Sequence, residues 1–95
     1  MTETIFAKGD ITYKLECRLS LNSFNRSYSY LFKLMQRGKG KRKWCDISGY
    51  ENQYRANTDI KDILKYLTKD EIMETAVLEH NNHSPSEKLI FNSQI

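Results

Sequence analysis

Residues 11–19, ITYKLECRL, alternate apolar and polar side chains without a break. The odd positions are apolar from Ile11 to Leu19, and the even positions are Thr, Lys, Glu and Arg. A period of two is typical of a strand that buries one face and exposes the other. The stretch therefore predicts a half-buried strand in a sheet whose apolar face needs a cover.

Three segments around this strand carry strand-like patterns: residues 4–7, 27–36 and 41–48. Turn residues separate them, namely Lys8-Gly9-Asp10, the polar loop 21–26, and the pair Gly38 and Gly40, which can take positive φ. This order predicts an antiparallel meander of three to four strands over residues 4–48.

Helical spacing follows the strands. Apolar residues at i, i+3, i+4 and i+7 predict a helix from about residue 58 to residue 67, with Asn57 or Thr58 as its N-cap. Residues 68–71, TKDE, match a capping box that starts a second helix or kinks a continuous one. That helix is expected to end at residues 80–82, where asparagine suits a left-handed cap. Residues 84–87 fit a short helix, and residues 89–91 fit an edge strand equally well.

The predicted fold class is α+β. Two amphipathic helices, over residues 58–81, pack on one face of the meander, and residues 84–95 form a short tail. The 95 residues, 39% hydrophobic and 28% charged, suit one globular domain spanning residues 1–95. Cys17 and Cys45 both lie in strand patterns, so both are predicted to be reduced thiols in the core.

The sequence offers little material for catalysis, and we expect a protein that is not an enzyme and needs no cofactor. His80 and His83 supply only two local metal ligands, where a site needs three or four, so no metal is expected. The glycines of residues 38–41, GKGK, are too close together for a phosphate-binding loop of nucleotide-hydrolysing enzymes.

The start carries no secretory signal and no apolar run approaches a membrane span, which predicts a cytoplasmic protein without a membrane partner.

Charge is distributed unevenly along the chain. Residues 1–50 hold ten Lys/Arg and four Asp/Glu, a balance of +6, whereas residues 51–95 hold five and eight, a balance of −3.

Six cations crowd into residues 33–43 ahead of the only tryptophan: Lys33, Arg37, Lys39, Lys41, Arg42 and Lys43, then Trp44. Mutual repulsion makes such a cluster costly unless anions relieve it, and phosphates do so. These seven residues are the predicted contact for nucleic acid or a nucleoprotein complex. The alternative is a solvated hairpin tip anchored by a buried tryptophan.

The side on which Trp44 lies separates these two interpretations. If Cys45 and Ile47 point to the core, then Arg42, Trp44 and Asp46 point outward, beside Lys33 and Lys14. Asp46 favours this register, and we expect Trp44 on the solvent-facing side of the sheet, flanked by Lys33 and Arg42.

In size and in lacking a recognisable motif, the chain resembles small accessory proteins of bacteriophages and mobile elements, including anti-CRISPR inhibitors. The resemblance implies inhibition of a host defence nuclease, although many such inhibitors are acidic mimics of nucleic acid and this chain is basic. A second interpretation is a protein–protein module or homodimer without a nucleic-acid role. It would use an exposed strand edge and the loop that carries Tyr50, Tyr54 and Arg55.

Overall fold

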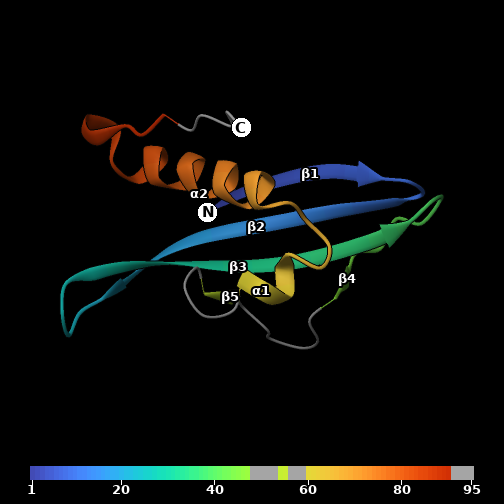
Figure 1. The fold of residues 1–95 in the computed structure, drawn as a ribbon, viewed down its shortest axis with the longest axis horizontal. Coiled ribbons are helices and arrows are strands. Elements are labelled where there is room, and N and C mark those ends of the chain that lie inside the picture. The colour runs from blue at the N-terminus through green and yellow to red at the C-terminus, as the bar shows by residue number, and fades with distance from the viewer. Residues whose placement is uncertain (48–53, 56–59, 91–95) are drawn as a thin grey trace.

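A long hairpin forms the centre of the sheet (Figure 1). In the computed structural model, which describes residues 1–47, 54–55 and 60–90, β2 (Ile11–Asn22) pairs antiparallel with β3 (Ser27–Gly38) over its full length. Both strands are longer than predicted. β2 continues to Asn22, which pairs with Ser27, so that only residues 23–26 of the expected loop 21–26 form the turn, and β3 continues to Gly38. The alternation of residues 11–19 thus marks only part of a twelve-residue strand.

Three shorter strands complete the sheet. β1 (Thr2–Lys8) pairs with β2, β4 (Cys45–Asp46) pairs with β3, and β5 (Tyr54–Arg55) also pairs with β3, all antiparallel. The strand predicted over residues 41–48 is therefore wrong in extent. Residues 39–44 instead form a loop, because Gly40 adopts φ +76° and the six-residue span between β3 and β4 is too long for a tight hairpin.

One long helix, α2 (Lys69–His83), lies against β1 and β2. Thr68 is its N-cap and accepts a hydrogen bond from the Glu71 N–H at 3.2 Å, as the capping box predicts. The helix ends later than residues 80–82 and without a left-handed cap. Ser84 is the C-cap, and Pro85 then opens the 3-10 helix η1 (Pro85–Glu87).

The first predicted helix is only a single turn, α1 (Ile60–Ile63). The chain leaves it through a turn closed by the hydrogen bond from Leu67 N to Ile63 O. Thr68 is then extended, with ψ 156°, so the two helical segments do not merge into one continuous helix. The predicted α+β class is confirmed, and over the described residues one long helix and one helical turn pack on the sheet, in place of the two amphipathic helices predicted.

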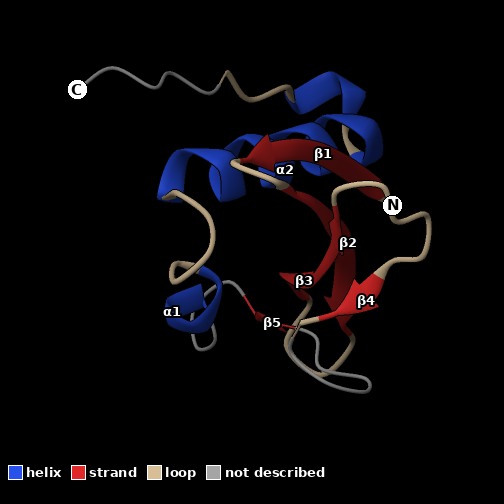
Figure 2. Cartoon of the chain, turned by 90° about the vertical axis from the view of Figure 1, so that its right-hand side faces the viewer, coloured by secondary structure: helices blue, strands red, loops and turns tan. Residues whose placement is uncertain are grey.

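The core lies between the sheet and the helices, which Figure 2 shows on the same side of the curved sheet. It is lined by alternate residues of β2 and β3 and by apolar residues of the helical half: Tyr13, Leu15, Cys17, Phe32, Leu34, Ile63, Leu67, Ile72 and Ala76. Cys17 is buried as predicted, whereas Cys45 is exposed. Cys45 pairs with Gln36 at the edge of the sheet, so the prediction of a core thiol there is wrong.

The outer face of the sheet carries the other set of alternate residues. Ile5, Lys14, Met35 and Asp46 form one row across four strands, because directly paired residues share a face. Within the described ranges, no helix is both long and apolar enough to cross a bilayer.

Candidate functional site

The basic loop, residues 37–44, leaves the end of β3 and turns back toward β4. The Lys41 N–H donates to the Gly38 carbonyl at 3.0 Å, and Gly40 at φ +76° occupies a conformation that side chains disfavour. Lys39, Lys41, Arg42 and Lys43 are all exposed. Four cations are therefore held close together in solvent by a turn that depends on glycine.

Trp44 is half-buried on the outer face, where two cations lie over its ring. The Arg37 guanidinium carbon is 4.4 Å and the Lys14 ammonium nitrogen 4.8 Å from the ring centroid. Each cation–π contact at a partly exposed site contributes about 0.5–1 kcal/mol. The cations over the ring are thus Lys14 and Arg37, and not Lys33 and Arg42, which were predicted to flank Trp44.

Lys33 does not join the loop cluster. Its ammonium nitrogen lies 4.0 Å from the Asp46 carboxylate, and it is four residues from Arg37, about 13 Å along the strand. Lys14 lies 3.8 Å from the Glu16 carboxylate, so acids partly offset both outer-face lysines. The remaining predicted residues do come together: Arg37, Lys39, Lys41, Arg42, Lys43 and Trp44.

Two shallow hollows flank the basic loop. One, of about 560 Å³, lies between Gln36, Cys45 and the cations Arg37, Lys41, Arg42 and Lys43. The other, of about 620 Å³, lies toward the β1–β2 turn and has Asp10 as its acidic residue. Both are open to solvent, so they suit an extended anionic chain better than an enclosed small molecule.

The second predicted contact falls largely outside the described residues. Tyr50 lies outside them, and only the backbone of Tyr54 and Arg55 is described, as β5. The structure does describe a sheet edge: β1 pairs only with β2 among the described strands, and its Ile5 side chain is 56% exposed.

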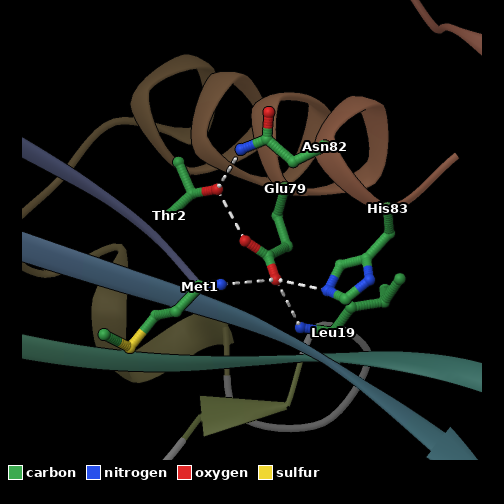
Figure 3. Close-up of polar contacts among 6 residues, drawn as sticks. All are labelled: Met1, Thr2, Leu19, Glu79, Asn82 and His83. Atoms are coloured by element: carbon green, nitrogen blue, oxygen red, sulfur yellow. Dashed lines mark hydrogen bonds and ion pairs between the residues drawn. The ribbon is translucent and has the colours of Figure 1, made fainter. Parts of the chain in front are cut away.

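A separate polar cluster surrounds Glu79 of α2, whose side chain is 0% exposed (Figure 3). The carboxylate accepts hydrogen bonds from Thr2 Oγ1 at 2.6 Å and from the Leu19 N–H at 3.1 Å. His83 Nε2 lies at 3.1 Å and the Met1 amine at 3.4 Å. Because these groups enclose both oxygens, the carboxylate fixes α2 to β1 and β2 and has no access to a substrate.

The charge of Glu79 affects its surroundings. Burial alone would raise the pKa of this carboxyl, but the hydrogen bonds from Thr2 and Leu19 and the Met1 amine outweigh it, so the pKa is lowered. Burial and the Glu79 charge together raise the pKa of the Cys17 thiol to about 12. Burial, Cys17 and Glu79 also raise the pKa of Tyr30. Cys17 is thus an unreactive core thiol.

The two histidines have structural contacts. His80 Nε2 lies 3.0 Å from the Glu87 carbonyl of η1, and His83 contacts Glu79. Over the described parts of the chain, no three His, Cys, Asp or Glu side chains come close enough together to hold a metal ion.

The sequence placed Lys14 beside Trp44 on the outer face, and the structure confirms this neighbour, although Lys14 was not among the predicted site residues. That its ammonium group lies over the ring depends on the path of the loop, which no local pattern encodes. Comparisons of the chain with family models, with curated proteins and with solved structures find no match.

Proposed function

We propose that the protein is a non-enzymatic binding protein whose basic loop contacts the phosphate backbone of a nucleic acid, free or within a nucleoprotein complex. The observation that carries this proposal is the arrangement at the loop. Lys39, Lys41, Arg42 and Lys43 are exposed together, and Arg37 stacks on Trp44 beside them. Such cations release condensed counterions when they dock on phosphates.

The Arg37–Trp44 stack supports a phosphate-binding role. A guanidinium can lie on an aromatic ring and still direct its N–H groups at an anion in its own plane. Stacking fixes the side chain in advance and reduces the conformational entropy lost on binding. Trp44 therefore serves as a positioning residue for Arg37 in this proposal.

The charge pattern extends the proposal along the hairpin. Between Glu16 and Asp46 the chain has no acidic residue and eight cations. A partner of opposite charge therefore meets no acid of this segment at either end of the hairpin, whereas Glu16 and Asp46 flank Lys33 at the middle of β3. Inhibition of a host defence nuclease, by binding its nucleic acid or its nucleoprotein complex, is one function that fits.

Matched charge variants test the proposal by fluorescence anisotropy with a labelled oligonucleotide. One variant replaces Lys39, Lys41 and Lys43 by glutamine, and the control replaces the exposed Lys65, Lys69 and Lys88. Both change the net charge by the same amount. We expect only the loop variant to weaken binding strongly and to reduce the slope of log K against log salt, by about two to three. Equal effects of the two variants would show a diffuse charge effect and refute the proposal.

The edge of β1 supports a second candidate, a homodimer or protein–protein module without a nucleic-acid role. An edge strand with an exposed isoleucine at Ile5 can pair with a strand of another chain. Light scattering distinguishes the two candidates. A salt-insensitive dimer that binds no oligonucleotide would favour edge pairing, whereas a monomer that binds in low salt would favour the basic loop.

A further inference from the structure

The far end of the β2–β3 hairpin is a two-stranded arm, residues 19–30. β1 pairs with β2 only as far as Cys17, and β5 pairs with β3 only at Leu31 and Phe32. Among the described residues, no third strand therefore flanks the pairs from Leu19↔Tyr30 to Asn22↔Ser27. Figure 1 shows the turn of this arm projecting past the end of α2. Four residue pairs give the ribbon a length of about 13 Å before its turn.

The two faces of the arm differ in chemistry. One face carries only short polar side chains, in the directly opposed pairs Ser20↔Ser29 and Asn22↔Ser27. The other face carries the pair Leu21↔Tyr28, of which the side chains are 56% and 65% exposed. Short hydroxyl and amide groups can approach base edges closely and exchange hydrogen bonds with them.

The turn at the end of the arm holds an apolar and a cationic residue in solvent. Phe24 is 99% exposed. Its N–H donates to Asn22 Oδ1 at 3.0 Å, and the Ser27 N–H donates to Asn25 Oδ1 at 3.1 Å, so side-chain hydrogen bonds fix the turn on both sides of Phe24. Arg26 adopts φ +54° between them. The arm contains no acidic residue.

We propose that this arm lies in the major groove of duplex DNA, with its serine and asparagine face toward the bases and with Phe24 and Arg26 at its tip. This inference rests on the proposed function and specifies its partner. The major groove of B-DNA, about 12 Å wide and about 8.5 Å deep, admits a two-stranded ribbon, whereas the deep major groove of A-form RNA is too narrow. The serines and Asn22 would contact base edges, Arg26 a phosphate, and Phe24 an apolar group such as a thymine methyl.

The spacing of the arm and the basic loop fits one duplex. They lie at opposite ends of β3, whose twelve residues span about 40 Å, and the molecule measures 42 Å in its longest dimension. One turn of B-DNA is about 34–36 Å. The loop would therefore reach phosphates about one helical turn from the groove that the arm enters, on the same side of the duplex.

The test compares an arm variant, Phe24→Ala with Arg26→Asn, with a control, Ile90→Ala with Lys88→Asn. Asparagine tolerates the positive φ of Arg26, and Ile90 is 93% exposed, so each variant removes one exposed apolar side chain and one cation without disturbing the core.

Affinities are measured by anisotropy for a 20-base-pair DNA duplex, its single strand and the RNA duplex of the same sequence. Wild type should prefer the DNA duplex at least tenfold. The arm variant should lose that preference, and the control should bind within twofold of wild type. Methyl green, which occupies the major groove, should compete with the protein, and distamycin, which occupies the minor groove, should not.

The outcomes separate the arm from the basic loop. If wild type binds the duplex but the arm variant binds equally well, the arm contact is refuted and the loop proposal stands. A wild type that binds no oligonucleotide refutes both. Competition by distamycin alone, or equal affinity for single strands and duplex, also overturns the groove assignment. Binding to vesicles of 30% phosphatidylserine that is lost in the arm variant, with duplex affinity unchanged, would make the arm a membrane contact instead.

Discussion

Replacing Glu79 by glutamine should destabilise the fold by about 2–3 kcal/mol. Hydrogen bonds to a charged group contribute about 1.5–3 kcal/mol each, and this carboxylate accepts three, from Thr2, the Leu19 N–H and His83, and also pairs with the Met1 amine. Glutamine can keep its acceptor oxygen toward Leu19 and His83, but the attraction to the Met1 amine is lost and the NH₂ group then faces Thr2 Oγ1, which already accepts from Asn82. We therefore expect the loss of about one charge-assisted bond together with a small repulsion. For a domain of this size, the melting temperature should fall by about 8–24 °C.

Urea unfolding followed by far-UV circular dichroism measures this change, with Glu74→Gln as the control on the exposed face of the same helix. The control should change stability by less than about 0.5 kcal/mol. Because the pKa of Glu79 is lowered in the folded protein, its contribution is present above the unfolded-state pKa and is lost as the pH falls through the folded-state pKa. The difference between wild type and Glu79→Gln should therefore shrink on acidification below the usual carboxyl range. If Glu79→Gln were as stable as Glu74→Gln, or if the stability difference from wild type did not change with pH, the proposed role of the Glu79 carboxylate in fixing α2 to β1 and β2 would be refuted.

Two further predictions concern the thiols and the tryptophan. In the folded protein, an aromatic disulfide reagent should modify only the exposed Cys45. It should react with Cys17 only on unfolding, because Cys17 is buried and its pKa is raised to about 12. Equal reaction rates for the two thiols in the folded protein would contradict this. Arg37→Gln should increase iodide quenching of Trp44 fluorescence and cost about 0.5–1 kcal/mol of stability, because one of the two cations over the ring is lost. Unchanged quenching in both Arg37→Gln and Lys14→Gln would contradict the stacked arrangement.

The central hairpin was predictable because its signal is local. Residues 11–19 alternate strictly, residues 27–36 place Tyr28, Tyr30, Phe32 and Leu34 on one side, and both segments are strands. The arm was missed because residues 21–26 are polar and resemble a loop, although a two-stranded ribbon with solvent on both faces needs no apolar alternation. The shortened strand at residues 41–48 has a related cause: its alternation is weak, and the glycines and crowded cations favour a loop.

The sequence predicted which residues make up the basic loop, but it predicted their spatial arrangement only in part. The crowding of cations in residues 37–43 is visible in the sequence, but the contact between Trp44 and Lys14 joins residues thirty positions apart and depends on the loop path. Only the contact of Glu79 with His83 is local, at i+4, whereas its partners Thr2 and Leu19 lie 77 and 60 residues away. Long-range pairings of this kind are set by the tertiary fold and not by periodicity.

Amide chemical-shift mapping of the ¹⁵N-labelled protein, titrated with a 20-base-pair DNA duplex, tests the central claim most directly. We expect the largest shifts at residues 37–45, with a second set at residues 20–29 if the arm also binds, and the indole N–H of Trp44 among the signals that move. The α2 amides on the other side of the sheet should stay unchanged. Shifts centred on α2 or on the β1 edge, with residues 37–45 unaffected, would contradict a nucleic-acid contact through the basic loop.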